Sequence, residues 1–171
     1  MNRQLARWNL LDADSAAQEI LPCCGSQAWA AALASRRPIS DEAALLATSS
    51  AVWLALPEKA WHEAFNSHPR IGENKAQTHA TAASLQASAQ EQSTALSADE
   101  AAKLALREGN QRYEKKFGRI FIVCASGRST EEILRILERR MTNDAATELH
   151  EAAEQQRQIS ELRLRRWLED D

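Results

Sequence analysis

Residues that favour β-strands are scarce in this sequence. Only two valines and one tyrosine occur among 171 residues, and aromatic residues make up 5% of the chain. Alanine, leucine, glutamate, glutamine and arginine dominate instead, and these are strong helix formers. Glycine and proline number only five and four, so we expect short loops. The composition excludes a strand-rich architecture and predicts an all-α fold.

A basic surface, a long apolar run and a cysteine framework are also missing. The net charge of -3 argues against a face that neutralises many phosphates. No apolar run is long enough to cross a membrane, and acidic residues interrupt any N-terminal signal-like core. Three cysteines, two of them adjacent, match neither a disulfide framework nor a zinc spacing. We expect a cytoplasmic protein with no nucleic-acid or membrane partner.

Motifs for metals and cofactors are absent as well. The four histidines form no i, i+4 pair and no HExxH motif, and no cysteine lies at ligand spacing from them. The sequence has no phosphate-binding loop, no GxGxxG and no GxSxG. We therefore expect no metal and no cofactor, so that any catalysis is acid–base and electrostatic.

Helical segments separated by proline and glycine fill the chain, without an internal repeat or a linker. We expect a single domain over residues 1–171, built as a bundle of about eight helices. The run "RIFIVCASG" is either a buried extended segment or a helix end. The predicted helices cover Ser15–Leu21, a segment from Ser26, one capped by Ser40, one opened by Pro57, Thr78–Gln92, two opened by the capping boxes Ser97–Glu100 and Ser129–Glu132, and a last one from about Asn143 to Leu168.

The stretch "AFNSHPRIGE", residues 64–73, places a histidine directly before a proline. His68 follows Trp61 by seven residues and Phe65 by three, so it closes the apolar stripe of the helix that Pro57 opens. Because a residue before proline avoids the α region, we expect His68 at the C-terminus of that helix. Pro69 then turns the chain, together with Gly72.

Two interpretations of His68 remain open from these residues alone. It could be a cap at the negative end of a helix dipole. It could also be an acid–base group on the inward face, with Arg70 and Glu73 following at the turn.

A second polar group lies in the helix predicted before residue 93. Ser88, Glu91 and Gln92 share one helix face at offsets of three and four, and Leu85 and Leu96 extend that face. The group is either a solvated face or a carboxylate with hydrogen-bonding partners in a partly apolar setting. The second arrangement suits a polar, nitrogen-rich small ligand.

Two further candidates lie near the C-terminal end. Arg163 continues the line of Gln156 and Ile159 in the last helix, so it either points inward towards a carboxylate or extends to the surface. The run Phe121–Ala125 is either plain core or an irregular segment that exposes backbone N–H groups.

Taken in order, these motifs resemble those of the 2-oxo-4-hydroxy-4-carboxy-5-ureidoimidazoline (OHCU) decarboxylases over nearly the entire chain. The motifs are "RP" at residues 37–38, "AFNSHPRIGE", "SAQEQ" at 88–92, "KFGRIFIVCASGR" at 116–128 and "LRL" at 162–164. The resemblance implies the all-α fold of that family, usually as a homodimer. It also implies the last step of the urate-to-allantoin route, in which OHCU gives (S)-allantoin and carbon dioxide without a cofactor.

The resemblance also implies roles for individual residues. His68 corresponds to the catalytic proton donor and Glu91 to its acidic partner, whereas Arg163 corresponds to a substrate anchor. The chain ends without the S-K-L type of peroxisomal address, which fits a bacterial cytoplasmic enzyme. The other positions that would contact substrate are Pro69, Ser88, Gln92, Phe121, Ile122, Val123, Cys124 and Ala125.

Two alternatives from other classes remain at this point. The chain could be a non-catalytic helical module that binds a ligand, with His68 as a cap only. It could also be a lyase or hydrolase that acts on a neighbouring ureido compound.

Overall fold

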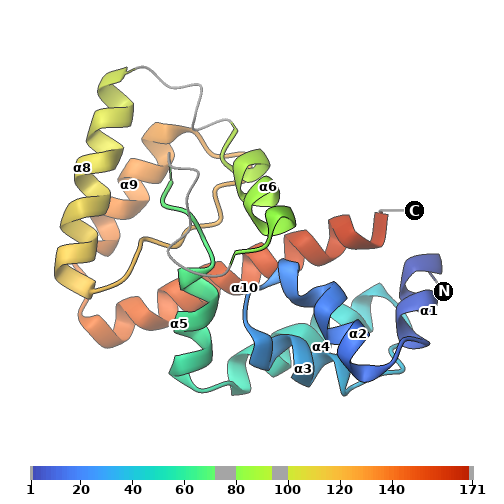
Figure 1. Ribbon diagram of the computed structural model, residues 1–171. Helices are drawn as coiled ribbons and strands as arrows, with labels where there is room; N and C mark the ends of the chain where they lie inside the picture. Colours follow the sequence, from blue (N-terminus) through green and yellow to red (C-terminus); the bar gives the residue numbers. More distant parts are fainter. Residues whose placement is uncertain (1, 72–79, 94–99, 170–171) are drawn as a thin grey trace. The chain divides into compact units, whose positions relative to one another are not determined.

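The computed structural model describes residues 2–71, 80–93 and 100–169 of the chain (Figure 1). These residues form nine α-helices and one short 3-10 turn, and no strand occurs among them, so the all-α prediction is confirmed. The helices are α1 Arg3–Asn9, α2 Ala13–Ile20, α3 Gln27–Ala34, α4 Glu42–Ala55, α5 Glu58–Asn66, α6 Ala82–Glu91, α8 Glu100–Phe117, α9 Thr130–Arg140 and α10 Ala145–Glu169, with the 3-10 turn η1 at Leu21–Cys23.

Side-chain caps define where most of these helices begin. Ser26 caps α3 as expected, and Ser129 and Glu132 form the predicted capping box of α9. The prediction of Ser40 as a cap is wrong, because the carboxylate of Asp41 accepts the Ala44 N–H at 2.8 Å and so caps α4. Helix α1, the first helix of the chain, was not predicted from the sequence. Gly72, Glu73, Leu96 and most of the capping box at 97–100 lie outside the described residues.

The chain divides into two compact units. The first unit comprises residues 1–64 and 157–171, and the second comprises residues 65–156. Helix α10 contributes its first half to the second unit and its second half to the first. The single domain expected for residues 1–171 stays a prediction.

Tryptophans form much of the core of the first unit. Trp8, Trp29 and Trp53 are fully buried, and the indole N–H of Trp8 donates to the Ala16 carbonyl at 2.9 Å. In this unit α2 packs on α3 and α3 packs on α4. The guanidinium of Arg37 donates to the Trp8 carbonyl at 2.8 Å and to the Leu11 carbonyl at 2.7 Å, which connects the segment after α3 to the C-terminal end of α1.

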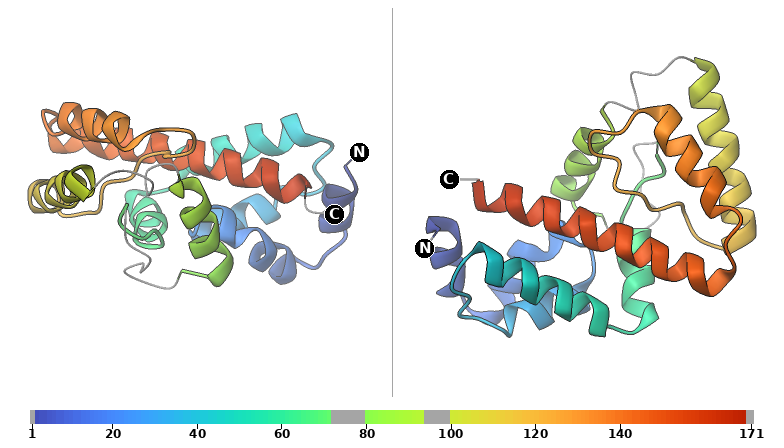
Figure 2. Two further views of the ribbon diagram at one scale, coloured as in Figure 1. Left: turned by 90° about the horizontal axis from the view of Figure 1, so that it is seen from above. Right: turned by 180° about the vertical axis from the view of Figure 1, so that it is seen from behind.

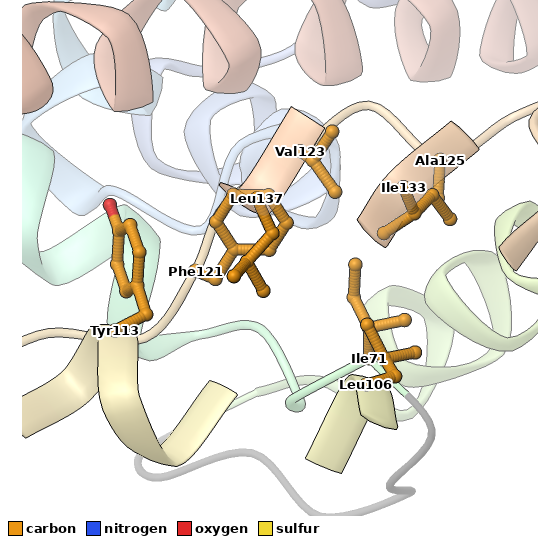
Figure 3. Close-up of a cluster of buried hydrophobic side chains, with 8 residues drawn as sticks. All are labelled: Ile71, Leu106, Tyr113, Phe121, Val123, Ala125, Ile133 and Leu137. Carbon is orange, nitrogen blue, oxygen red and sulfur yellow. The ribbon is translucent and has the colours of Figure 1, made fainter. Parts of the chain in front are cut away.

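In the second unit, α8 lies alongside α9 (Figure 1 and Figure 2). A Cβ at Gly109 of α8 would lie 3.2 Å from Leu137 Cδ1 of α9, so the missing side chain permits this close approach. Gly118 ends α8 with φ +68°, a conformation that favours glycine. One hydrophobic cluster of this unit's core comprises the buried residues Ile71, Leu106, Tyr113, Phe121, Val123, Ala125, Ile133 and Leu137 (Figure 3).

Candidate active site

His68 lies just past the end of α5, in the second unit. The helix ends at Asn66, and the His68 N–H still donates to the Phe65 carbonyl at 3.1 Å. Pro69 follows, and its ring keeps His68 from continuing the helix. The imidazole is only 6% exposed, and its Nε2 lies 2.8 Å from Oε1 of Gln156 in α10. The chain thus holds a buried, hydrogen-bonded imidazole where the sequence predicted a helix end.

An ion pair and a hydrogen bond connect the residues after His68 to α8. Arg70 makes a two-pronged ion pair with Glu114, in which Nη2 lies 2.9 Å from Oε2. The Ile71 carbonyl accepts a hydrogen bond from the Asn110 side chain at 3.3 Å, and the Ile71 side chain belongs to the core of the second unit. These contacts fix the backbone on the C-terminal side of His68.

The second polar group lies on α6, whose buried face is polar. Ser88, Glu91 and Gln92 are all buried, which contradicts the alternative of a solvated face. Ser84 extends this face by one turn and is also buried, whereas Leu85 is only half-buried. A helix that buries hydroxyl, carboxylate and amide groups requires polar partners for them, because an unpaired buried polar group is costly.

The run Phe121–Ala125 is irregular and connects α8 to α9. The side chains of Phe121, Val123 and Ala125 enter the core beside Leu137 and Ile133 (Figure 3). This alternation is typical of an extended backbone, so the extended alternative predicted for "RIFIVCASG" applies to this run.

Side chains of α9 and α10 hold the backbone of this run. The Cys124 N–H donates to Oε1 of Gln155 at 3.0 Å, so at least this N–H group is already engaged within the protein. The Ile122 carbonyl accepts from Nη1 of Arg140 at 2.6 Å. The side chains of Phe121, Val123 and Ala125 belong to the core of the second unit.

Arg140 belongs to a fully buried network with Glu148 and Tyr113. Its Nη2 lies 2.6 Å from Oε1 of Glu148, and the Tyr113 hydroxyl donates to the same carboxylate oxygen. Asn143 donates to the second carboxylate oxygen at 2.9 Å. The Arg140 guanidinium also lies 4.7 Å from the centre of the Phe121 ring. Burial raises the pKa of Tyr113, and its hydrogen bond to Glu148 raises it further.

Adjacent glutamines of α10 therefore connect two parts of the predicted site. Gln156 holds the His68 imidazole and Gln155 holds the Cys124 backbone. The side-chain amide of Gln155 also donates to Glu151 at 3.1 Å, which directs its oxygen towards Cys124. Sequence reasoning placed Gln156 on the inward line of the last helix but assigned no site role to it, and it missed Gln155, Arg140 and Glu148.

Arg163 lies in the first unit, on the second half of α10. It is buried, which contradicts the alternative of a surface arginine, and its Nη1 donates to the Pro22 carbonyl at 3.3 Å. Burial raises the pKa of the neighbouring Cys24 thiol to about 12, although Ser160 and the Arg163 charge act in the opposite direction.

Two features of the described residues bear on other kinds of function. In the part of the chain that the structure describes, no group of three or more histidine, cysteine, aspartate or glutamate residues is placed to hold a metal ion. None of its helices is long and apolar enough to cross a membrane.

Comparison with known proteins identified one family model and several relatives. The model described as OHCU decarboxylase matches residues 9–165. The uric acid degradation bifunctional protein TTL of Arabidopsis thaliana is 38% identical over 150 residues, which are 86% of this chain and 46% of the relative. The chain thus spans less than half the length of that protein.

Two other matches cover most of this chain and most of the matched chain. The 2-oxo-4-hydroxy-4-carboxy-5-ureidoimidazoline decarboxylase of Amia calva is 32% identical over 136 residues, which are 79% of this chain and 77% of the relative. A crystal structure of an OHCU decarboxylase in the presence of (S)-allantoin superposes with a TM-score of 0.76 at 35% identity. That match covers 89% of this chain and 98% of the solved one.

Proposed function

Because this chain belongs to the OHCU decarboxylase family, as its motifs predicted, we propose that it converts OHCU to (S)-allantoin and carbon dioxide. The family and the relatives support a decarboxylation role in urate degradation. Such a reaction breaks a carbon–carbon bond, which defines a carboxy-lyase. The observation that carries the proposal is the buried imidazole of His68, held by a hydrogen bond of 2.8 Å to Gln156.

The substrate itself can accept the electrons that decarboxylation releases. The bond between the ring carbon and the carboxylate breaks, and its electron pair forms a double bond to the neighbouring ring carbon. The former C=N pair moves onto nitrogen, where the adjacent carbonyl delocalises it. A proton then adds to the neighbouring carbon as the hydroxyl becomes a carbonyl and its proton passes to the ring nitrogen, so each turnover takes up one proton. No metal or electron-accepting cofactor is required by this sequence of steps.

In this proposal, His68 supplies the proton and Glu91 is its acidic partner. A positioned imidazole can exchange protons near neutral pH and contributes to catalysis as a general acid. Glu91, on the buried polar face of α6, accepts a hydrogen bond from the substrate hydroxyl or ring N–H. Delivery of the proton to one face of the ring explains the formation of a single enantiomer.

The remaining expected contacts hold the substrate in this proposal. Ser88 and Gln92 offer hydroxyl and amide groups on the same face as Glu91, and Pro69 shapes the turn beside the imidazole. The run Phe121–Ala125 contributes main-chain groups in this proposal, while the side chains of Phe121, Ile122, Val123 and Ala125 are buried. The role of Arg163 as a substrate anchor rests on the family motif.

The test uses OHCU generated enzymatically from urate. With this protein present, we expect the absorbance of OHCU to decay faster than it does spontaneously, and circular dichroism to show (S)-allantoin. Decay at the spontaneous rate with a racemic product would contradict the proposal and favour a binding module. A chiral product other than (S)-allantoin would favour the alternative of a lyase or hydrolase for another ureido compound.

We also propose a homodimer, as the family resemblance implies, and a cytoplasmic location, as the cysteine content favours. Sedimentation equilibrium should give twice the mass of 19.0 kDa. Fractionation of cells that express the full-length protein should recover the activity in the cytoplasm. A monomeric mass, or activity in another fraction, would contradict the respective proposal.

A further inference from the structure

Side chains of the second unit hold one edge of the irregular run between α8 and α9. The Ile122 carbonyl accepts a hydrogen bond from Nη1 of Arg140 at 2.6 Å. The Cys124 N–H donates to Oε1 of Gln155 at 3.0 Å, and the Cys124 carbonyl accepts from Nε of Arg128 at 3.0 Å. In an extended chain the main-chain groups of alternate residues point to the same edge, so all three bonds lie on one edge of the run.

Val123 lies between these two residues and therefore directs its N–H and its carbonyl to the opposite edge. Its side chain belongs to the core cluster (Figure 3), and the residue is only 5% exposed. Within the parts of the chain that the structure describes, neither its N–H nor its carbonyl makes a hydrogen bond. Because buried main-chain groups are nearly always paired with protein, water or a ligand, Val123 offers one donor and one acceptor to a bound molecule.

We infer that Gln155 is a positioning residue, which holds the Cys124 N–H so that Val123 presents its main-chain groups to the substrate. OHCU carries carbonyl oxygens and N–H groups in its ring and in its ureido arm, and these match a donor and an acceptor on one residue. The inference rests on the proposed function. It adds to that function a residue of α10 and the edge of the run that binds.

The orientation of the Gln155 amide is itself fixed. Its Nε2 donates to Oε1 of Glu151, one turn earlier in α10, at 3.1 Å. A carboxylate only accepts hydrogen bonds, so this contact directs the amide nitrogen to Glu151 and leaves the amide oxygen for the Cys124 N–H. Removal of that oxygen would leave a main-chain N–H without this acceptor, which favours a shift of the run.

Selective labelling of valine tests the ligand contact in the unmodified protein, because the sequence contains only Val52 and Val123. The substitution Val52→Ile identifies the remaining nitrogen-15 valine signal as that of Val123. We expect (S)-allantoin, used as the probe, to change the Val123 signal and to slow the exchange of this N–H with solvent. The Val52 N–H lies within α4 and is the internal control. A Val123 signal that (S)-allantoin leaves unchanged would overturn the inference.

Gln155→Met tests the role of the amide in catalysis, since methionine has a similar length but no acceptor oxygen. We expect kcat/KM for OHCU to fall roughly 10- to 100-fold, because a lost hydrogen bond and a small displacement of substrate-binding groups have effects of this size. The response of Val123 to (S)-allantoin should weaken in the same variant. Gln111→Met makes the same chemical change at an exposed position of α8 and should alter neither quantity.

An exchange of the two side chains separates positioning from damage to the helix. The double variant Glu151→Gln with Gln155→Glu keeps the net charge, and its carboxylate at position 155 accepts from both the Cys124 N–H and the amide at position 151. It should restore most of kcat/KM, whereas Gln155→Glu alone places two carboxylates one turn apart and should not.

These variants distinguish failure of the inference from failure of the proposed function. If Gln155→Met and Gln111→Met have equal kcat/KM, the inference is wrong and the proposed decarboxylation stands. Absence of OHCU turnover by the unmodified protein would contradict the proposed function itself, and this inference with it. The valine measurement on the unmodified protein needs no variant at position 155, so it decides the case even where Gln155→Met fails to fold.

Discussion

At the scale of the single residue, the three cysteines of this chain differ in how deeply they are buried. Cys23 and Cys24 are buried, and burial raises the pKa of Cys24 to about 12, so its thiol stays protonated at neutral pH. Cys124 is half-buried and lies in the run that we propose to contact substrate. Only the thiolate form of a cysteine reacts readily with electrophiles, so the three thiols should differ in reactivity.

We predict one fast-reacting thiol in the folded protein. A disulfide reagent at neutral pH should modify Cys124 first, with the other two reacting only on unfolding in denaturant. Mass spectrometry of peptides identifies the modified residue, and Cys124→Ser is the control that removes the fast phase. Rapid modification of Cys24 in the folded state would contradict the burial described for it.

Tyr113 gives a second prediction, because it is the one tyrosine in the sequence. Its pKa is raised in the folded protein, by burial first and then by the hydrogen bond to Glu148. Folding therefore favours the protonated phenol. The stabilisation is complete below the unfolded pKa of about 10 and is lost progressively as the pH rises above it.

Ultraviolet absorbance of tyrosinate measures this directly. We expect the folded protein to show little tyrosinate at a pH where a free tyrosine is half ionised, and the signal to appear together with unfolding. Above that pH, Tyr113→Phe should lose free energy of unfolding less steeply than the unmodified protein. Ionisation of Tyr113 near its ordinary pKa without unfolding would refute the buried network.

At the scale of the element, the run Phe121–Ala125 depends on a buried ion pair. Arg140 of α9 holds the Ile122 carbonyl and pairs with Glu148 of α10, and both charged groups are fully buried. Removing one partner of such a pair leaves the other charge uncompensated. The same network thus stabilises the second unit and places the segment that we propose to contact substrate.

We predict that Glu148→Gln lowers the free energy of unfolding by about 3–5 kcal/mol, the range for breaking a buried ion pair. Urea denaturation measures the change. Glu138→Gln makes the same substitution at an exposed position of α9 and should change stability by less than about 0.5 kcal/mol, as is usual for surface substitutions. Equal effects of the two substitutions would contradict the buried network.

The sequence predicted the helices and their caps better than it predicted the contacts between helices. Ser129 begins α9 as its capping box predicted, since caps are local signals. The polar face of α6 was predicted from Ser88, Glu91 and Gln92, but Ser84 was missed because the apolar Leu85 suggested a different edge of that face. Asp41 rather than Ser40 caps α4, since neighbouring polar residues compete for the same N–H groups.

The sequence alone did not predict contacts between residues that lie far apart in the chain. His68 and Gln156 are 88 positions apart, and Cys124 and Gln155 are 31 apart. Periodicity placed Gln156 on an inward line but could not say which side chain it meets, because pairing depends on how the helices pack. The predicted roles of Glu91 and Arg163 come from family motifs and stay predictions.

At the scale of the whole molecule, the proposed enzyme is defined by its family and by one proton donor, His68. The family model matches residues 9–165, and the fold agrees with a solved family member at a TM-score of 0.76. A binding module on the same helices would tolerate the loss of the imidazole, whereas the proposed enzyme would not. The substitution His68→Gln distinguishes these, since a glutamine can still donate to Gln156 but cannot act as a general acid.

The most direct measurement is the rate of (S)-allantoin formation from OHCU, followed by circular dichroism with His68→Gln beside the unmodified protein. We expect the substitution to lower this rate by about 100- to 10,000-fold, the range for losing a general acid. We also expect the residual product to approach the racemate of the spontaneous reaction. Near-normal formation of (S)-allantoin by a folded His68→Gln variant would contradict the role of His68 as the proton donor.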